Sequence, residues 1–162
     1  SSLGLRIVKE ESELLEAIEY VFTVDDEIVI EKFMEGTETT VAVLGNDELE
    51  ALPVIEIVPL AADTYDFESK YAPGGCEHII PARISEEVSD KVKDLAKRAH
   101  LALGCRGVSR TDFIIDEKGD PWILETNTIP GMTATSLLPD TAGVAGYTFP
   151  QLCTKLVEFA LS

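Results

Sequence analysis

A chain of 162 residues, of which 45% are hydrophobic, is long enough to form one domain with a buried core. Its formal net charge of −17 argues against nucleic acid and anionic membranes as partners, because both attract basic surfaces. The cysteines lack the C-x-x-C spacing of a zinc ribbon, and no apolar run is long enough to span a bilayer. We therefore expect reduced thiols in a cytoplasmic protein with no membrane or nucleic-acid partner.

The amino-terminal part of the chain predicts a strand, a helix and several further strands. Leu5–Val8 is a plausible strand, and Glu10–Phe22 carries apolar residues at helical spacing. Three more segments are predicted to be strands, namely Glu27–Phe33, Glu38–Leu44 and Leu52–Val58.

The middle of the chain predicts a long loop followed by a helix. Ala61–Arg83 is rich in glycine, proline and aromatic residues, and such loops are lids or binding loops, or else disordered. Ser85 can cap a helix whose first turn carries Glu86 and Glu87, which the positive end of the helix dipole favours. The buried face of this helix is expected to be Val88, Val92, Leu95, Ala96 and Ala99.

A last helix is predicted to begin at Thr148, with Pro150 in its first turn. Its inward-facing residues are expected to be Leu152, Leu156, Val157 and Ala160. Strands interspersed with helices that cover one face predict an α+β layer built on a mainly antiparallel sheet.

Between these two helices lies a predicted hairpin with the most informative residues of the chain. If Lys118-Gly119 forms a two-residue loop, Asp112 lies opposite Glu125 and Arg110 lies opposite Asn127, so all four side chains share one face. Opposed carboxylates repel unless a cation neutralises them, and oxygen ligands of this kind suit Mg²⁺ whose shell substrate phosphates complete. The alternative is a solvated face whose charges pair with one another.

The segment after the hairpin leaves through Pro130-Gly131 and runs toward a short apolar helix around Thr135–Leu138. Gly131 permits a positive φ or a close backbone approach, so its N–H could face a reacting oxygen. Ser136 would present a hydroxyl near the same site.

Four motifs run in order along the chain: SSLGL, IEKFMEGTE, YDFESKY and GVSRTDFIID…ILETNTIPGMTATSLLP. Together they resemble the D-alanine–D-alanine ligases, an ATP-grasp family of bacterial cell-wall synthesis, over essentially the whole chain. The resemblance implies that residues 1–30 are a remnant of the central ATP-grasp domain and that residues 31–162 are the carboxy-terminal ATP-grasp domain. It also implies a piece of a longer ligase, inactive alone, that lacks the amino-terminal domain and most of the central domain. The complete enzyme would be a homodimer.

The same resemblance assigns an ATP site. Its positions are Glu31, Lys32, Phe33 and Met34 for the adenine, Glu38 for the ribose, and Ser1, Ser2 and Lys70 for the phosphates. The residues alone leave open that Phe33 and Met34 are core. Tyr71 would bond to Ser1 as the loop closes, and tyrosine rather than phenylalanine there favours D-alanine over D-lactate as the second substrate.

The resemblance also gives the hairpin its chemical roles. Asp112, Glu125 and Asn127 would hold two Mg²⁺ ions, for which Mn²⁺ could substitute. Arg110 and the N–H of Gly131 would stabilise the developing oxyanion.

The second substrate completes the implied reaction. Ser136 and the backbone of Leu137 would hold its carboxylate at a helix start. The implied activity is the ATP-dependent joining of two D-alanine molecules through D-alanyl phosphate, for peptidoglycan precursors. Two alternatives stay open, namely another ATP-grasp carboxylate–amine ligase and a nucleotide-binding module without catalysis.

Overall fold

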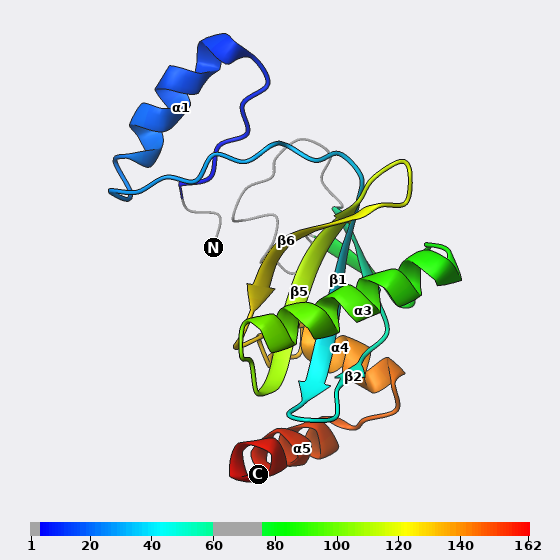
Figure 1. Cartoon of the computed structure of the whole chain (residues 1–162). Helices are drawn as coiled ribbons and strands as arrows, with labels where there is room; N and C mark the ends of the chain where they lie inside the picture. Colours follow the sequence, from blue (N-terminus) through cyan, green and yellow to red (C-terminus); the bar gives the residue numbers. More distant parts are fainter. Residues whose placement is uncertain (1–3, 60–75) are drawn as a thin grey trace.

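The computed structural model describes residues 4–59 and 76–162, and an antiparallel sheet lies at its centre (Figure 1). The strands follow the order β4-β3-β1-β5-β6, and the short β2 pairs with β1. Every strand pair in the described residues is antiparallel, which confirms the predicted α+β class. The strands are β1 Thr37–Gly45, β2 Glu50–Ala51, β3 Ile55–Pro59, β4 Cys76–Ile79, β5 Gly107–Ile115 and β6 Pro121–Asn127.

The helices of the described residues are the 3₁₀ turn η1 Glu11–Glu13 and the α-helices α1 Leu14–Val21, α3 Glu86–Ala102, α4 Leu137–Val144 and α5 Phe149–Leu161. Two of them, α3 and α5, begin at the predicted caps Ser85 and Thr148, whereas the short helix expected around Thr135–Leu138 runs from Leu137 to Val144. Ser85 Oγ accepts a hydrogen bond from the N–H of Val88 ahead of α3, and Thr148 forms a capping box with Gln151 ahead of α5. None of these helices combines the length and the apolar run needed to cross a bilayer.

Both faces of the sheet are covered, so the expectation that helices cover one face was wrong. Val41 and Val43 of β1 pack with Phe113 and α3 on one face. Ala42 and Leu44, whose side chains alternate with them, pack against α4 and α5 on the other face. Because β1 carries apolar residues on both faces of the sheet, each face needs helices to cover it. Figure 1 shows α3 lying across the sheet, with α4 behind it.

Two of the predicted strands are absent from the structure. Leu5–Val8 and Glu27–Phe33 run outside any sheet, because neither segment has a partner strand among the described residues. The predicted helix Glu10–Phe22 does form, as η1 followed by α1. Figure 1 shows α1 set apart from the sheet and joined to β1 by an extended segment.

The helix faces are predicted in part. Val92 and Ala96 of α3 are buried as expected, and His100 extends the same stripe by one turn. In α5, Leu152 and Leu156 pack into the core. Val157 and Ala160 point outward, and Phe159 packs inward in their place, because the buried stripe follows positions 152, 156 and 159.

Candidate functional site

The hairpin of β5 and β6 closes with a three-residue loop, in place of the predicted two-residue loop. The N–H of Asp116 donates to the carbonyl of Asp120, and Gly119 takes a φ of +80° inside the loop. The Asp116 carboxylate accepts bonds from the indole N–H of Trp122 and from the backbone N–H groups of Asp120 and Lys118. These bonds lower the pKa of Asp116 below its usual value, and the bond from Trp122 has the largest effect.

A β-bulge restores the predicted pairing despite the longer loop. Phe113 pairs with Ile123, whereas Asp112 pairs with Glu125, so Leu124 is the extra residue on β6. The loop and the bulge thus compensate for each other. Asp112 lies opposite Glu125 and Arg110 lies opposite Asn127, as the sequence predicted.

The neighbouring strand β1 brings two more polar residues to the same face. Thr40 pairs with Asp112 and Ala42 with Arg110, so the side chains of Glu38 and Thr40 lie on the hairpin's polar face. On this face, α4 and α5 cover the part of the sheet that includes Ala42 and Leu44. The polar residues lie beyond the covered part. The β1–β5 register therefore gathers Glu38 with the hairpin residues.

Asp112 is held by three hydrogen bonds. The Arg110 guanidinium donates from Nε to Oδ1 and from Nη2 to Oδ2, each at 3.0 Å. The hydroxyl of the buried Thr40 donates to Oδ1 at 2.5 Å. The two charged side chains are 15% and 14% exposed, so this bidentate pair is largely withdrawn from water. The alternative interpretation, in which the charges of the hairpin pair with one another, thus holds for Arg110 and Asp112.

Glu125 and Asn127 have different surroundings. Glu125 is exposed, and within the described ranges no side chain forms a hydrogen bond or ion pair with its carboxylate. The Asn127 Oδ1 accepts the N–H of Ile129 at 3.0 Å, which orients the amide. In the described part of the chain no three His, Cys, Asp or Glu residues converge as a metal site. The predicted ligand set comprises two carboxylates and one amide.

Gly131 and Ser136 meet at the start of α4. The φ of Gly131 is not positive, so of the two predicted reasons for glycine only the close approach applies. A Cβ at Gly131 would lie 2.7 Å from Ser136 Oγ. That hydroxyl accepts the N–H of Thr133 at 3.0 Å, and Ser136 is the N-cap of a helix that begins at Leu137. The first-turn amides of Leu137 and Leu138 have no intrahelical acceptor and remain available to an anion.

The remaining predicted positions are less well defined by the structure. Glu31, Lys32 and Phe33 are exposed in the extended segment before β1, and Met34 is partly buried. Ser1, Ser2, Lys70 and Tyr71 lie outside the described residues.

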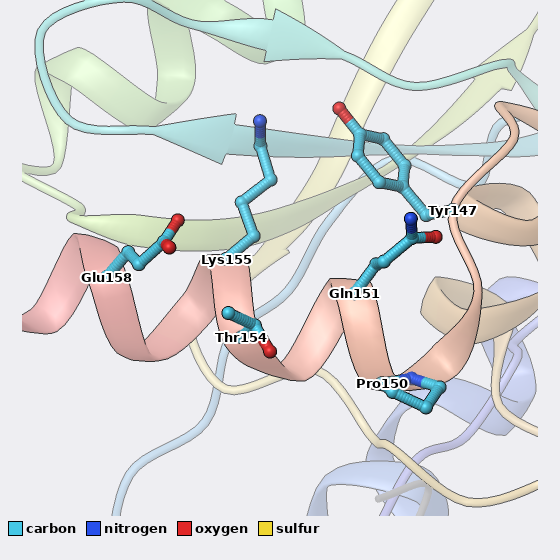
Figure 2. A pocket seen from close by; sticks show the side chains of 6 residues that line it. All are labelled: Tyr147, Pro150, Gln151, Thr154, Lys155 and Glu158. Atoms are coloured by element: carbon cyan, nitrogen blue, oxygen red, sulfur yellow. The ribbon is translucent and has the colours of Figure 1, made fainter.

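One shallow surface groove runs along α5, away from the hairpin residues. Its volume is about 380 Å³, and Figure 2 shows its lining residues Tyr147, Pro150, Gln151, Thr154, Lys155 and Glu158. The Lys155 ammonium lies 3.8 Å from Glu50 and above the ring of Tyr147, so its charge is already engaged. No predicted site residue lines this groove.

Sequence reasoning missed Thr40 and a second polar pair. His78 Nδ1 of β4 lies 2.7 Å from Asp140 Oδ2 of α4. Neither Thr40 nor this pair carries a local signal, because their partners are 72 and 62 residues away along the chain.

Solved structures that resemble this fold include D-alanine ligases. The chain superposes with a TM-score of 0.84 on the crystal structure of the VanG D-Ala:D-Ser ligase from Enterococcus faecalis, at 37% identity over 98% of this chain and 46% of that one. The D-alanine–D-alanine ligase from Bacillus anthracis complexed with ATP gives 0.80, at 30% identity over 98% of this chain and 49% of that one. The fold is thus that of the carboxy-terminal domain of an ATP-grasp ligase.

Sequence comparison narrows this class. Residues 1–158 match the family described as "D-ala D-ala ligase C-terminus". The D-alanine–D-alanine ligases of Halalkalibacterium halodurans and Pelotomaculum thermopropionicum are 53% and 49% identical to the chain over 99% of its length. The chain belongs to this ligase family. It spans about half the length of the curated relatives it matches, 53% and 50% in these two cases.

Proposed function

We propose that this chain forms half of an ATP-dependent D-alanine–D-alanine ligase. This half would bind the metal and the acceptor, which is the second D-alanine, whose amine attacks the activated first one. The observation that carries the proposal is the shared face of Arg110, Asp112, Glu125 and Asn127 in a chain of this family. The reaction requires an activated carboxylate, a nucleophilic amine and a cation to accompany the phosphates of ATP.

The residues present fit a divalent cation. Asp112, Glu125 and Asn127 offer hard oxygen atoms on one face, and Glu125 has no other partner among the described residues. Arg110 and Thr40 fix the Asp112 carboxylate: Oδ1 accepts two hydrogen bonds and Oδ2 accepts one, which leaves a lone pair on Oδ2 for a cation. Mg²⁺, in the proposal two ions with Mn²⁺ as a substitute, would neutralise charge on the phosphates when bound.

The chain's own residues serve two chemical steps. In the first, a D-alanine carboxylate oxygen bonds to the γ-phosphorus of ATP, the bond to ADP breaks, and D-alanyl phosphate forms. In the second, the amine of another D-alanine bonds to the acyl carbon, phosphate leaves and the amine loses a proton. Arg110 and the N–H of Gly131 would stabilise the oxyanion that develops, a contribution of about 3 kcal/mol per donor in comparable sites.

Both substrates would contact further residues. ATP would contact the extended segment Glu31–Met34, the ribose-binding Glu38, and Ser1, Ser2 and Lys70. Ser136 and the N–H of Leu137 would hold the acceptor carboxylate, which the uncapped amides of this helix start support. The neighbour from Enterococcus faecalis is a D-Ala:D-Ser ligase, so one of the two amino acids differs between that structure and the D-alanine–D-alanine ligase from Bacillus anthracis. Tyr71 favours D-alanine here and would bond to Ser1.

The proposal includes the larger assembly. Residues 1–30 would belong to a central domain and residues 31–162 to the carboxy-terminal domain, which the absence of any buried residue among 4–38 supports. The missing domains would complete a cytoplasmic homodimer that makes peptidoglycan precursors, and this chain alone would be inactive.

The test is ADP formation by the full-length protein that contains this chain. We expect ADP release that depends on D-alanine and Mg²⁺, with D-alanyl-D-alanine as the product. ADP release that requires a different carboxylate and amine would assign the chain to another ATP-grasp ligase. Nucleotide binding without turnover would assign it to a binding module, and either result would contradict the proposal.

A further inference from the structure

We propose that His78 and Asp140 are a positioning pair for the acceptor site. The pair would hold the first turn of α4, and hence Ser136 and Leu137, at a fixed place over the sheet. This inference rests on the proposed function, because it concerns the site that would receive the second amino acid.

The contact joins two elements that are remote in sequence. The Nδ1 of His78, on β4, lies 2.7 Å from the Oδ2 of Asp140, on α4. The side chains are 25% and 35% exposed, so water screens this pair only in part. An N–H that donates to a carboxylate at this distance is a charge-assisted hydrogen bond.

The first turn of α4 is held by one buried leucine and by few side-chain hydrogen bonds to described residues. Ala142 is buried in the core and the Thr141 hydroxyl donates to the carbonyl of Pro53 at 2.7 Å, but both residues belong to the second turn. In the first turn, Leu138 is buried and Pro139 has no N–H. Ser136 does not cap the helix with its own side chain, because its hydroxyl bonds to Thr133. Asp140 therefore supplies the side-chain bond that ties this turn to the sheet.

The anchor lies on the same face as the hairpin site. His78 pairs with Ile57 on β3, and Ile55 of that strand pairs with Thr40, which bonds to Asp112. Side chains two residues apart on β3 share a face, so His78, Thr40 and Asp112 all project from the face of the sheet that α4 covers in part. The pair thus fixes the acceptor end of the site relative to the residues that would handle the phosphoryl group. Joining two bound reactants requires such a fixed relation, since the attacking atom must lie about 3–3.5 Å from its target.

The experiment uses four variants of the full-length protein: His78→Gln, Asp140→Asn, the double variant and Asp140→Glu. We expect each single substitution to raise the KM of the second D-alanine about tenfold, while the KM values of ATP and the first D-alanine stay unchanged. The double variant should match the single variants, because one contact is lost in all three. Asp140→Glu keeps a carboxylate and should regain most of the acceptor affinity.

A second measurement, amide hydrogen exchange, tests the positioning of α4 independently of the ligase reaction. Amide hydrogen exchange across residues 136–141 should accelerate about tenfold in the single variants. The matched control is Asp120→Asn, which breaks the exposed ion pair with Lys91, 2.8 Å long against 2.7 Å for His78 and Asp140, at the far end of the hairpin. It should change neither the acceptor KM nor this exchange.

The outcomes are distinguishable. If the wild-type protein shows no D-alanine-dependent turnover but the variants accelerate exchange, the proposed function fails and the anchoring of α4 stands. If the wild type ligates D-alanine and the variants leave both the acceptor KM and the exchange unchanged, the positioning role is overturned. If Asp140→Asn lowers the acceptor KM while His78→Gln raises it, the pair acts by removing a repulsive charge, and positioning is also overturned.

Discussion

At the scale of single residues, Asp112 is the centre of the site because three donors and one carboxylate converge on it. Arg110 balances its charge, Thr40 fixes its orientation, and Glu125 lies directly opposite. The arrangement places one neutralised and one uncompensated carboxylate side by side. Such a pair suits a cation that adds to the existing hydrogen bonds.

We expect Asp112→Asn and Glu125→Gln each to lower turnover of the full-length protein at least about a hundredfold, because each removes charge from the proposed cation site. The unfolding midpoint should change little for Glu125→Gln, whose side chain is exposed. Steady-state kinetics with varied Mg²⁺ would check this. Glu117→Gln, an exposed charge in the loop of the same hairpin, is the control. Wild-type rates in the first two variants would contradict the metal assignment.

Thr40→Val should raise the Mg²⁺ concentration for half-maximal turnover about tenfold, since it removes the bond that orients Asp112. It should also destabilise the protein by about 2 kcal/mol, because the hydrogen bond is charge-assisted and its donor is buried. Urea unfolding and Mg²⁺ titration measure the two effects. Thr39→Val is a matched control, because Thr39 is equally buried and its hydroxyl has no partner in the described structure. Equal effects at both positions would refute the role of Thr40.

At the scale of elements, the hairpin of β5 and β6 decides which face its side chains present. Its three-residue loop requires the left-handed backbone of Gly119, and the bulge at Leu124 corrects the register that this loop would otherwise shift. The loop is also packed against α3, since a Cβ at Gly119 would lie 3.2 Å from Val88 Cγ2.

Gly119→Ala should therefore destabilise the protein by more than the roughly 1 kcal/mol that a left-handed alanine costs. Gly104→Ala provides the comparison, because Gly104 has a φ of +65° with nothing within 4 Å of an added Cβ. Urea unfolding of both variants would measure the difference. Adding Val88→Ala should narrow the gap between the two glycine variants. A gap that stays the same would show that the contact with Val88 is not its cause.

At the scale of the whole molecule, two core clusters hold the sheet, and buried polar groups are tied into them. Glu56 accepts two bonds from the Arg83 side chain and one from its backbone N–H, and these lower the pKa of the carboxyl. This contribution is present above the ordinary pKa of 4.5 and is lost as pH falls through the lower folded value. His100 is fully buried at the end of α3, and its Nδ1 bonds to Ser109 Oγ at 2.8 Å.

Burial lowers the pKa of His100 below its ordinary value of 6.5. The unfolded chain therefore binds a proton at higher pH than the folded protein does, so stability should fall as pH drops below about 6.5. Urea unfolding of the full-length protein from pH 8 to pH 5 measures this loss. His100→Gln should flatten the dependence in this range. An unchanged slope in His100→Gln would contradict the assignment.

The sequence by itself determined the signals that act over a few residues. Ser85 and Thr148 mark helix starts, and the spacing of Arg110, Asp112, Glu125 and Asn127 predicts a shared face. The motif order predicts the family. The helix starts and the shared face depend on hydrogen bonds or periodicities within a turn or a hairpin, which neighbouring residues specify.

Only the tertiary structure decided the contacts between distant elements. The register of β1 against β5 brings Thr40 to Asp112, and the packing of α4 over β4 brings His78 to Asp140. The cover on both sheet faces and the rotation of α5 toward Phe159 have the same origin. The periodicity of a strand shows which of its residues share a face, but it does not specify the neighbouring strand. The pairing of strands is selected by the burial of the whole sheet. Even the correct prediction for the hairpin depended on two local errors, the loop length and the missing bulge, that cancel in the folded chain.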